Sequence, residues 1–531
     1  MFRAQIREEI EKLVPKGTVF SVERPENSEH GDYSSNIALV LAKKIGNPPA
    51  GGPKEVAEWM KATLGSRAPK LGKIIERIES AGPGFLNFFI AREALVENLS
   101  IFSRRGERFS EREGVGAPGE RVKTERNGKR ETSKKINIEF ISANPTGPLT
   151  MANGRGGFYG DALANVLSAV GRKVTREYYI NDAGNQIKLL GESILAAEGK
   201  IPAREELYKG EYIKKLKEKT AAQAAASLLK EIKVSLIKAG IKFDVWYSED
   251  KNLHKKNELK KILTFLNKKK VLHEKEGALW LADAVVIKSN KESTYFLADL
   301  AYHYDKFMKR KFDIAIDIWG ADHHGYIERM KKGVEAIGVE PARLQIIIMQ
   351  LVRLISGGKE VKMSKRSGEF VTLDELLKEV GVDAARWFFL ERSPNTHMDF
   401  DMDLAKERSK KNPVYYVQYA HARSCSILRK GKPGKKADLM LLDKPEELAL
   451  IKKILQLHEI IEDITDDYQA HRLTKYVYEL AQTFTNFYEK CLVIDTKNKE
   501  LTQARLALVS ATKKTLKQTL TLMGIAAPEK M

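Results

Sequence analysis

The stretch "NPTGPLTMANGRGG", residues 144–157, has a composition suited to holding phosphates. It is rich in Gly and Pro and leads into a helical pattern. A loop that opens a helix presents backbone N–H groups to anions. The stretch contains no Lys and no His, and Arg155 is its only charged side chain. The residue types therefore leave open which groups in this loop would hold a nucleotide.

A second stretch, "SGGKEVKMSKRSGEFVTL", carries Lys359, Lys362 and Lys365 around Ser364. Ammonium groups neutralise a polyphosphate as point charges, and the flanking small residues let such a loop move. Three lysines in a loop are, taken alone, more often a solvated surface. The composition is thus suited to a polyphosphate but does not by itself identify one.

A βαβ pattern beginning at Ile136 positions the first of these loops. "INIEF" alternates like a strand, residues 154–170 place apolar side chains on one helical face, and "KVTREYYI" is typical of a following strand. This is half of a doubly wound, Rossmann-like parallel sheet, in which ligands bind at the carboxyl edge of the strands. The first loop lies at that edge.

The rest of the chain indicates further domains, and the predicted fold class is α/β. We expect a doubly wound parallel-sheet domain with an insertion, an N-terminal α+β domain and a C-terminal all-α helical bundle. Strands are expected to resume at 278–289, 295–300 and 312–325. The predicted parts are an N-terminal domain at 1–110, a flexible basic linker at 111–135, the Rossmann-like domain at 136–412 with an insertion at about 190–280, and the helices at 413–531.

The composition limits the classes of protein to which the chain can belong. The 531 residues carry a net charge of +20, which favours a polyanionic partner such as nucleic acid over a merely solvated surface. The chain has no apolar run long enough to span a bilayer and lacks the apolar stretch of a signal peptide, so no membrane partner is expected. Two cysteines argue against a disulfide framework and fit a reducing cytoplasm.

The string Lys362-Met363-Ser364-Lys365 resembles the "KMSKS" loop of class I aminoacyl-tRNA synthetases, and residues 144–157 stand where those enzymes carry a "HIGH" signature. The flanking sequence resembles arginyl-tRNA synthetases in particular, and the likeness runs in order from about residue 18 to the last residue. It rests on "FSVERPENSEHGDY", "INIEFISANPTGPL", "NGRGGFYGDALANVLSAVGRKVTREYYINDAGNQIKLL", "GADHHGY", "GVDAARWFF", "NPVYYVQYAHAR" and "MGIAAPEKM".

The resemblance implies an arginine–tRNA ligase that forms arginyl-adenylate from L-arginine and ATP and passes the arginyl group to the terminal adenosine of tRNA(Arg). It places Glu139, Tyr295 and Asp299 in the arginine pocket, with Asn144 and His323 near the α-amino and carboxyl ends of the amino acid. Carboxylates in fork geometry with an aromatic wall are what a guanidinium requires. Each of these residues also has an ordinary alternative as an ion-pair partner, a core residue or a helix cap.

For ATP, the resemblance implies catalytic roles for Lys362, Lys365, Thr150 and Asn153. The full expected ATP-binding set is Pro148, Thr150, Asn153, Gly154, Lys362, Ser364 and Lys365. Magnesium is expected to arrive with ATP, held mainly by phosphates. No zinc or other metal site is expected, because the adjacent His323 and His324 would point to opposite faces of a strand.

The resemblance also assigns the two ends of the chain to tRNA. The helices after Pro413 correspond to an anticodon-binding bundle and carry Tyr415, Tyr416, Tyr419, His421 and Arg423, although an aromatic stripe is more often core. The N-terminal unit corresponds to a domain that contacts the outer corner of tRNA. We expect a cytoplasmic monomer.

The chain departs from the family pattern at the signature itself. That pattern has histidines at positions 150 and 153, where this chain has Thr150 and Asn153. A hydroxyl and an amide can donate hydrogen bonds but carry no positive charge. The departure raises the alternative of a catalytically impaired tRNA-binding relative. A class I synthetase for another amino acid is a second alternative, which the carboxylates disfavour.

Overall fold

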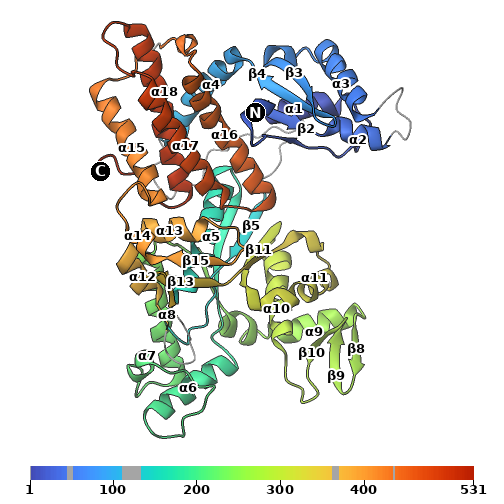
Figure 1. The fold of residues 1–531 in the computed structure, drawn as a ribbon. Helices are drawn as coiled ribbons and strands as arrows, with labels where there is room; N and C mark the ends of the chain where they lie inside the picture. Colours follow the sequence, from blue (N-terminus) through green and yellow to red (C-terminus); the bar gives the residue numbers. More distant parts are fainter. Residues whose placement is uncertain (1, 45–51, 111–132, 362–369, 435–436) are drawn as a thin grey trace.

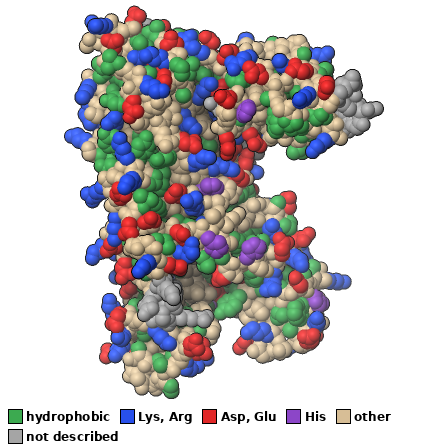
Figure 2. Space-filling view, viewed as in Figure 1, with side chains coloured by type: hydrophobic (Ala, Val, Ile, Leu, Met, Phe, Trp, Pro, Cys, Tyr) green, Lys and Arg blue, Asp and Glu red, His purple; other side chains and the backbone are tan. Residues whose placement is uncertain are grey.

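The computed structural model describes residues 2–44, 52–110, 133–361, 370–434 and 437–531. The N-terminal unit lies beside a bundle of long helices, and both lie at one end of a central parallel sheet (Figure 1). Two smaller lobes extend from the other end of that sheet, one with α6 and α7 and one with β8, β9 and β10. The N-terminal unit and the β8–β10 lobe project toward the same side, with a recess between them (Figure 2).

The N-terminal unit is an α+β domain, as its pattern predicts. Its four-stranded antiparallel sheet has the order β1-β2-β4-β3, and its core includes Phe2, Tyr33 and Phe88. Its main elements are α1 (Phe2–Glu11), β1 (Val22–Glu23), β2 (Tyr33–Ser35), α2 (Ile37–Lys44), α3 (Pro53–Arg67), β3 (Ile75–Ala81), β4 (Phe85–Ile90) and α4 (Arg92–Ser110).

The central sheet has five parallel strands in the order β12-β11-β5-β6-β7. These strands are β5 (Lys135–Glu139), β6 (Lys173–Ile180), β7 (Val245–Ser248), β11 (Ile314–Gly320) and β12 (Leu344–Met349). Helix α5 (Met151–Ala169) connects β5 to β6, which confirms the βαβ pattern. Gly160 lets this helix approach the sheet closely, because a Cβ there would lie 2.4 Å from Phe140 Cγ. The first loop therefore lies at the carboxyl edge of β5.

Two expectations about the middle of the chain are wrong. The stretch 190–280, expected to be an insertion, includes β7, which belongs to the central sheet. Residues 295–300, expected as a strand, lie in helix α10 (Tyr295–Tyr304). The strand pattern at 278–289 forms a separate three-stranded sheet. The other elements here are α6 (Asn185–Ala197), α7 (Glu211–Lys214), α8 (Ala221–Lys238), α9 (Glu258–Lys268), β8 (Leu272–Lys275), β9 (Ala278–Leu281), β10 (Ala284–Ile287) and α11 (Ile327–Ala336).

The remainder of the chain forms a small mixed sheet and then the long helices. The small sheet has the order β14-β13-β15, from β13 (Val352–Ser356), β14 (Lys359–Val361) and β15 (Met398–Asp401), and is accompanied by α12 (Leu373–Val380), α13 (Val382–Leu390) and α14 (Met402–Lys406). The bundle is α15 (Pro413–Lys430), α16 (Pro445–Asp467), α17 (Arg472–Lys490) and α18 (Lys499–Leu522). No helix in the described ranges is long and apolar enough to cross a membrane.

A buried carboxylate joins the N-terminal unit to the bundle. Glu459 of α16 is 2% exposed and accepts hydrogen bonds from the Tyr33 hydroxyl at 2.7 Å and from Arg24 Nε at 2.9 Å. The backbone N–H of Arg3 also donates to it, at 3.4 Å. The first and last domains of the chain thus share one hydrogen-bonded junction.

Candidate active site

Arg155, the only charged side chain in the first loop, points into the protein. It is 1% exposed, and its guanidinium donates to the backbone oxygens of Gln350 and Thr396, both at 2.7 Å, and of Ser393 at 2.9 Å. Burial lowers the pKa of Arg155 to about 10, so the group stays charged at neutral pH. Arg155 therefore anchors α5 to the segments before β13 and β15, and is not placed to hold a phosphate.

The first turn of α5 is joined to the segment that follows the lysine-bearing stretch. Met151 N donates to the oxygen of Val371 at 3.0 Å, and Leu373 N donates to the oxygen of Leu149 at 2.9 Å. The expected ATP-binding residue Pro148 is half-buried in this loop, while Gly154 packs inward against Leu373. The expected residues Lys362, Ser364 and Lys365 lie outside the described residues.

Thr150 and Asn153 form a capping box at the start of α5. Thr150 is the N-cap residue, and Asn153 occupies the third helical position. Asn153 Oδ1 accepts from the backbone N–H of Thr150 at 2.9 Å and from its hydroxyl at 3.0 Å. The two residues that replace the family's histidines thus bond to each other at the carboxyl edge of the sheet.

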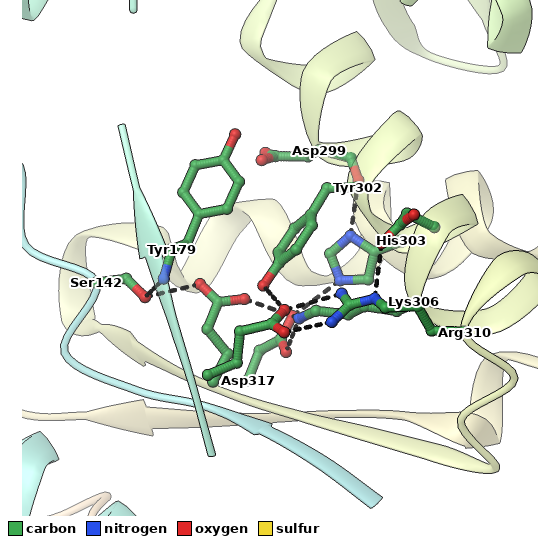
Figure 3. A network of polar contacts seen from close by, with 11 residues as sticks. Ser142, Tyr179, Asp299, Tyr302, His303, Lys306, Arg310 and Asp317 are labelled. Atoms are coloured by element: carbon green, nitrogen blue, oxygen red, sulfur yellow. Dashed lines mark hydrogen bonds and ion pairs between the residues drawn. The ribbon is translucent and has the colours of Figure 1, made fainter. Parts of the chain in front are cut away.

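Five acidic side chains gather beside this edge, and we call them the carboxylate cluster. Figure 3 shows Asp299 and Asp317 of this cluster with the groups around them. The cluster comes from four strands or strand ends of the central sheet and from α10. Its members are Glu139 of β5, Glu177 of β6, Glu249 directly after β7, Asp299 of α10 and Asp317 of β11.

A fully buried lysine neutralises two carboxylates of the cluster. Lys306 Nζ lies 2.7 Å from Asp317 Oδ1 and 2.8 Å from Glu139 Oε2. The ring of His303 bridges Asp317 Oδ2 and the backbone oxygen of Asp299, both at 2.8 Å. Burial alone would raise the pKa of Asp317, but Lys306 and His303 outweigh it and lower that pKa to about 2.

Glu139 is held on both of its oxygens. Lys306 binds Oε2, and the Ser142 hydroxyl donates to Oε1 at 3.0 Å while accepting from Tyr179 N at 3.0 Å. Ile141 and Ser142 both have positive φ, 67° and 38°, which costs energy in non-glycine residues and is typical of functional loops. Burial raises the pKa of Glu139, although Lys306 opposes this. The alternative of an ion-pair partner therefore applies to Glu139.

Asp299 retains an uncompensated charge. The Tyr326 hydroxyl donates to Asp299 Oδ2 at 2.7 Å, and among the described residues Asp299 has no ion-pair partner. Burial raises the pKa of Asp299 to about 6, although the Tyr326 hydrogen bond and nearby His303 lower it. Glu139 and Glu249 add to the rise as like charges. A bound cation would relieve all of these effects.

Glu249 is a functional candidate that the sequence did not single out. It is 5% exposed, and His254 Nε2 lies 3.1 Å from its Oε1. Its neighbours Ser248 and Asp250 both bond to Asp182, at 2.6 and 2.9 Å, which fixes the backbone around it. The signal that could have revealed it is an acidic residue directly after the short strand "VWYS", since that strand's carboxyl end adjoins the site.

Aromatic side chains lie beside Asp299 and Glu249. Burial and the charges of Glu249 and Asp299 raise the pKa of the Tyr179 hydroxyl, which places that ring beside both. Tyr295 lies one helical turn before Asp299 on α10 and is 58% exposed. The cluster thus combines surplus negative charge with aromatic rings, the environment that a guanidinium prefers.

Asn144 and His323 lie at the ends of neighbouring strands. Asn144 is half-buried in the loop after β5, and the described residues offer its side chain no hydrogen-bond partner. His323 is exposed on a short 3₁₀ helix after β11, with its ring 5.9 Å from that of Trp319. The expectation that His323 and His324 lie on a strand is wrong, so the argument from opposite strand faces does not apply to them.

The bundle presents a cation between two tyrosine rings. The guanidinium carbon of Arg423 on α15 lies 4.9 Å from the ring centre of Tyr419 and 4.8 Å from that of Tyr488 on α17. Tyr488 is 38% exposed. In contrast, Tyr416 packs on Tyr478 and His421 is fully buried, so only part of the aromatic stripe faces outward.

Three family models match the chain in order. Residues 1–90 match the arginyl tRNA synthetase N terminal domain, residues 196–410 match the catalytic domain of tRNA synthetases class I (R), and residues 417–531 match the DALR anticodon binding domain. The matches fall on the N-terminal unit, the central domain and the helical bundle.

Curated relatives match along the whole length. The arginine–tRNA ligase of Carboxydothermus hydrogenoformans is 41% identical, over 96% of this chain and 94% of the relative. That of Citrifermentans bemidjiense is also 41% identical, over 100% and 99%. Arginyl-tRNA synthetase structures from Thermus thermophilus (TM-score 0.79, covering 100% of both chains) and Plasmodium falciparum (TM-score 0.77, covering 100% of this chain and 98% of that one) share the fold at 21% identity.

Proposed function

The chain belongs to the arginyl-tRNA synthetase family, and from that premise we propose which of its groups perform the steps of the reaction. The activity is that of an arginine–tRNA ligase. L-arginine and ATP form arginyl-adenylate and pyrophosphate, and a hydroxyl of the terminal adenosine of tRNA(Arg) then takes the arginyl group and releases AMP. The relatives' activity disfavours the alternative of a non-catalytic relative.

Asp299 and Glu249 bind the guanidinium of arginine in this proposal. The supporting observation is the charge balance of the carboxylate cluster. Lys306 occupies Glu139 and Asp317, and Arg310 Nη2 binds Glu177 at 2.9 Å, which leaves Asp299 and Glu249 without a Lys or Arg partner among the described residues. Tyr295 supplies the aromatic wall. Glu139 acts indirectly, because its Oε1 accepts a hydrogen bond from the Ser142 hydroxyl and so holds that side chain in place.

Adenylate formation takes place between the cluster and the first turn of α5. Asn144 and His323, on neighbouring strand ends, hold the α-amino and carboxyl groups, so that the carboxylate attacks the α-phosphate in line. Lys362 and Lys365 neutralise the departing pyrophosphate with Ser364 beside them. Pro148 and Gly154 shape the loop, and Mg²⁺ enters as the MgATP complex.

Recognition of tRNA uses both ends of the chain. The helical bundle is the anticodon-binding domain of the family. We assign base stacking there to Tyr419 and Tyr488, because aromatic rings with an intervening guanidinium stack on any base. The N-terminal unit contacts the outer corner of tRNA. The protein acts as a cytoplasmic monomer, a state that sedimentation at working concentration tests, and its two free thiols fit a reducing compartment.

The decisive experiment is aminoacylation of total tRNA with each amino acid in turn. Arginine alone should be charged onto tRNA, in an ATP-dependent reaction. Charging of another amino acid would refute the guanidinium assignment, and no charging with any amino acid would refute catalysis. Asp299→Asn and Glu249→Gln should each raise the KM for arginine strongly, because each leaves the guanidinium poorly paired in a desolvated site.

A further inference from the structure

Tyr326 holds one oxygen of the Asp299 carboxylate. The Tyr326 hydroxyl lies 2.7 Å from Asp299 Oδ2, and it is the donor because an ionised carboxylate can only accept. Asp299 is half-buried, and in the described part of the chain its Oδ1 has no hydrogen-bond partner. The carboxyl group extends from α10 toward Tyr179 (Figure 3). Asp299 therefore presents one oxygen that is held by the protein and one that remains for a ligand.

The ring of Tyr326 is itself held by packing from three elements. Tyr326 ends the 3₁₀ segment Ala321–Tyr326 and directly precedes α11. Its ring centre lies 5.8 Å from that of Trp319 on β11 and 6.1 Å from that of Phe296 on α10. The guanidinium carbon of Arg329 on α11 lies 5.8 Å from the same ring centre. Because the ring is fixed in this way, its hydroxyl fixes the orientation of the carboxylate that it binds.

The same hydrogen bond favours the charged form of Asp299. Burial raises the pKa of Asp299 to about 6, and the bond from Tyr326 is the largest of the effects that lower it. Burial and the charge of Asp299 raise the pKa of the Tyr326 hydroxyl, so the tyrosine keeps its proton and remains the donor. A buried carboxylate without a Lys or Arg partner depends on such a bond to stay ionised.

Building on the ligase function proposed above, we infer that Tyr326 is a positioning residue for arginine, whose hydroxyl keeps Asp299 ionised and directs its Oδ1 toward the guanidinium. Tyr326 does not itself contact the substrate. A guanidinium presents its N–H donors in one plane, so it requires acceptor oxygens with fixed directions and full negative charge. The bond from Tyr326 supplies both properties to Asp299.

The substitution Tyr326→Phe tests this role, because it removes one hydroxyl and keeps the packed ring. Calorimetric titration of the full chain gives the dissociation constant of arginine at each pH, expressed as the ratio of variant to wild type. Losing a hydrogen bond to a charged group should raise the pH at which arginine binding is lost by about one to two pH units. The ratio should therefore be only a few-fold at pH 8 and roughly tenfold larger at pH 5. At saturating arginine and pH 8, kcat should be unchanged, because Tyr326 touches no reacting atom.

The ratio removes the contributions of groups that are the same in both proteins, including the ionisation of arginine itself. The unchanged side chains are His303, Glu139, Glu249 and Tyr179, which face Asp299, and Arg329 beside the Tyr326 ring. Tyr476 on α17 offers a matched control, since its buried hydroxyl donates to the backbone oxygen of Lys453 at 3.0 Å. Tyr476→Phe also loses one hydroxyl hydrogen bond, and it should leave the arginine affinity unchanged at every pH.

A double mutant tests whether Tyr326 acts through Asp299. In Asp299→Asn there is no charge for the hydroxyl to stabilise. The double variant Asp299→Asn/Tyr326→Phe should therefore bind arginine about as weakly as Asp299→Asn alone, with the same dependence on pH. Losses of affinity that add in full would overturn the positioning role.

The outcomes distinguish the inference from the function on which it rests. If the wild type charges tRNA with arginine, a ratio that stays near one or does not change with pH overturns the inference and leaves the ligase function standing. A wild type that charges a different amino acid, or none, overturns the proposed function and the inference with it.

Discussion

Arginine binding is expected to weaken in acid because Asp299 must lose a proton to pair with the guanidinium. Burial raises the pKa of Asp299 to about 6. A bound guanidinium favours the ionised form and lowers that pKa. The affinity for arginine therefore falls in acid, because the ionised form of Asp299, which is competent to bind, prevails above about pH 6 and is lost as the pH falls below it.

The size of the loss in arginine affinity depends on the fraction of Asp299 that is ionised. With the pKa of Asp299 at about 6, about one molecule in ten is competent at pH 5, so the apparent dissociation constant of arginine should be roughly tenfold higher at pH 5 than at pH 8. At pH 6 about half of the Asp299 carboxyls are protonated, and binding should release about half a proton per arginine. Calorimetric titration in two buffers of different ionisation enthalpy measures that release.

The control is Asp299→Asn, whose amide does not titrate. It should bind arginine more weakly and abolish the proton release. His303, His254, Glu139 and Glu249 also face this site. An affinity that is flat from pH 5 to pH 8, or a proton release that persists in Asp299→Asn, would refute the assignment of this carboxylate to the guanidinium.

Three further predictions concern other parts of the molecule. Lys365→Ala should lower kcat for adenylate formation by an order of magnitude or more, with the arginine affinity nearly unchanged, if its transition-state bond is worth about 1.5–3 kcal/mol; an unchanged kcat removes the lysine from the mechanism. Lys306→Met should lower the free energy of unfolding in urea by about 3–5 kcal/mol, because Asp317 and Glu139 lose their cation; an unchanged midpoint contradicts this. Tyr488→Ala should weaken tRNA binding by about 1–3 kcal/mol in filter assays without changing the KM for arginine, and wild-type affinity would place the bases elsewhere.

Much of the fold was predictable because its elements follow simple periods. The alternation at β5 and the apolar face of α5 identified the βαβ unit, and the bundle after Pro413 is helical as its pattern indicates. Residues 295–300 misled because a six-residue apolar run fits a strand as well as a buried helix. Strand β7 was missed because it is short and lies within a charged helical stretch.

The site was predictable where a side chain stood out from its strand and not where tertiary burial defines it. Glu139 stands out in an otherwise apolar strand. Lys306, by contrast, lies in "DKFMKRKF", which has the composition of a solvated surface, yet it is completely buried between two carboxylates. Its role depends on Asp317 of β11 and Glu139 of β5 converging on it, and no local pattern contains that information. The same reasoning covers Glu249, which lies near Tyr179 of β6 and near the like charge of Asp299 of α10.

The junction at Glu459 bears on how the protein would bind an elongated ligand, because it joins the N-terminal unit to the bundle. Separating the N-terminal unit from the bundle would leave that carboxylate buried without Arg24 and Tyr33, a loss of several kcal/mol for a buried charge. The two surfaces assigned to tRNA therefore keep a set spacing before tRNA arrives. In the function proposed above, this spacing would match the separation between the outer corner and the anticodon of a tRNA, so that little conformational entropy of the enzyme would be lost on binding.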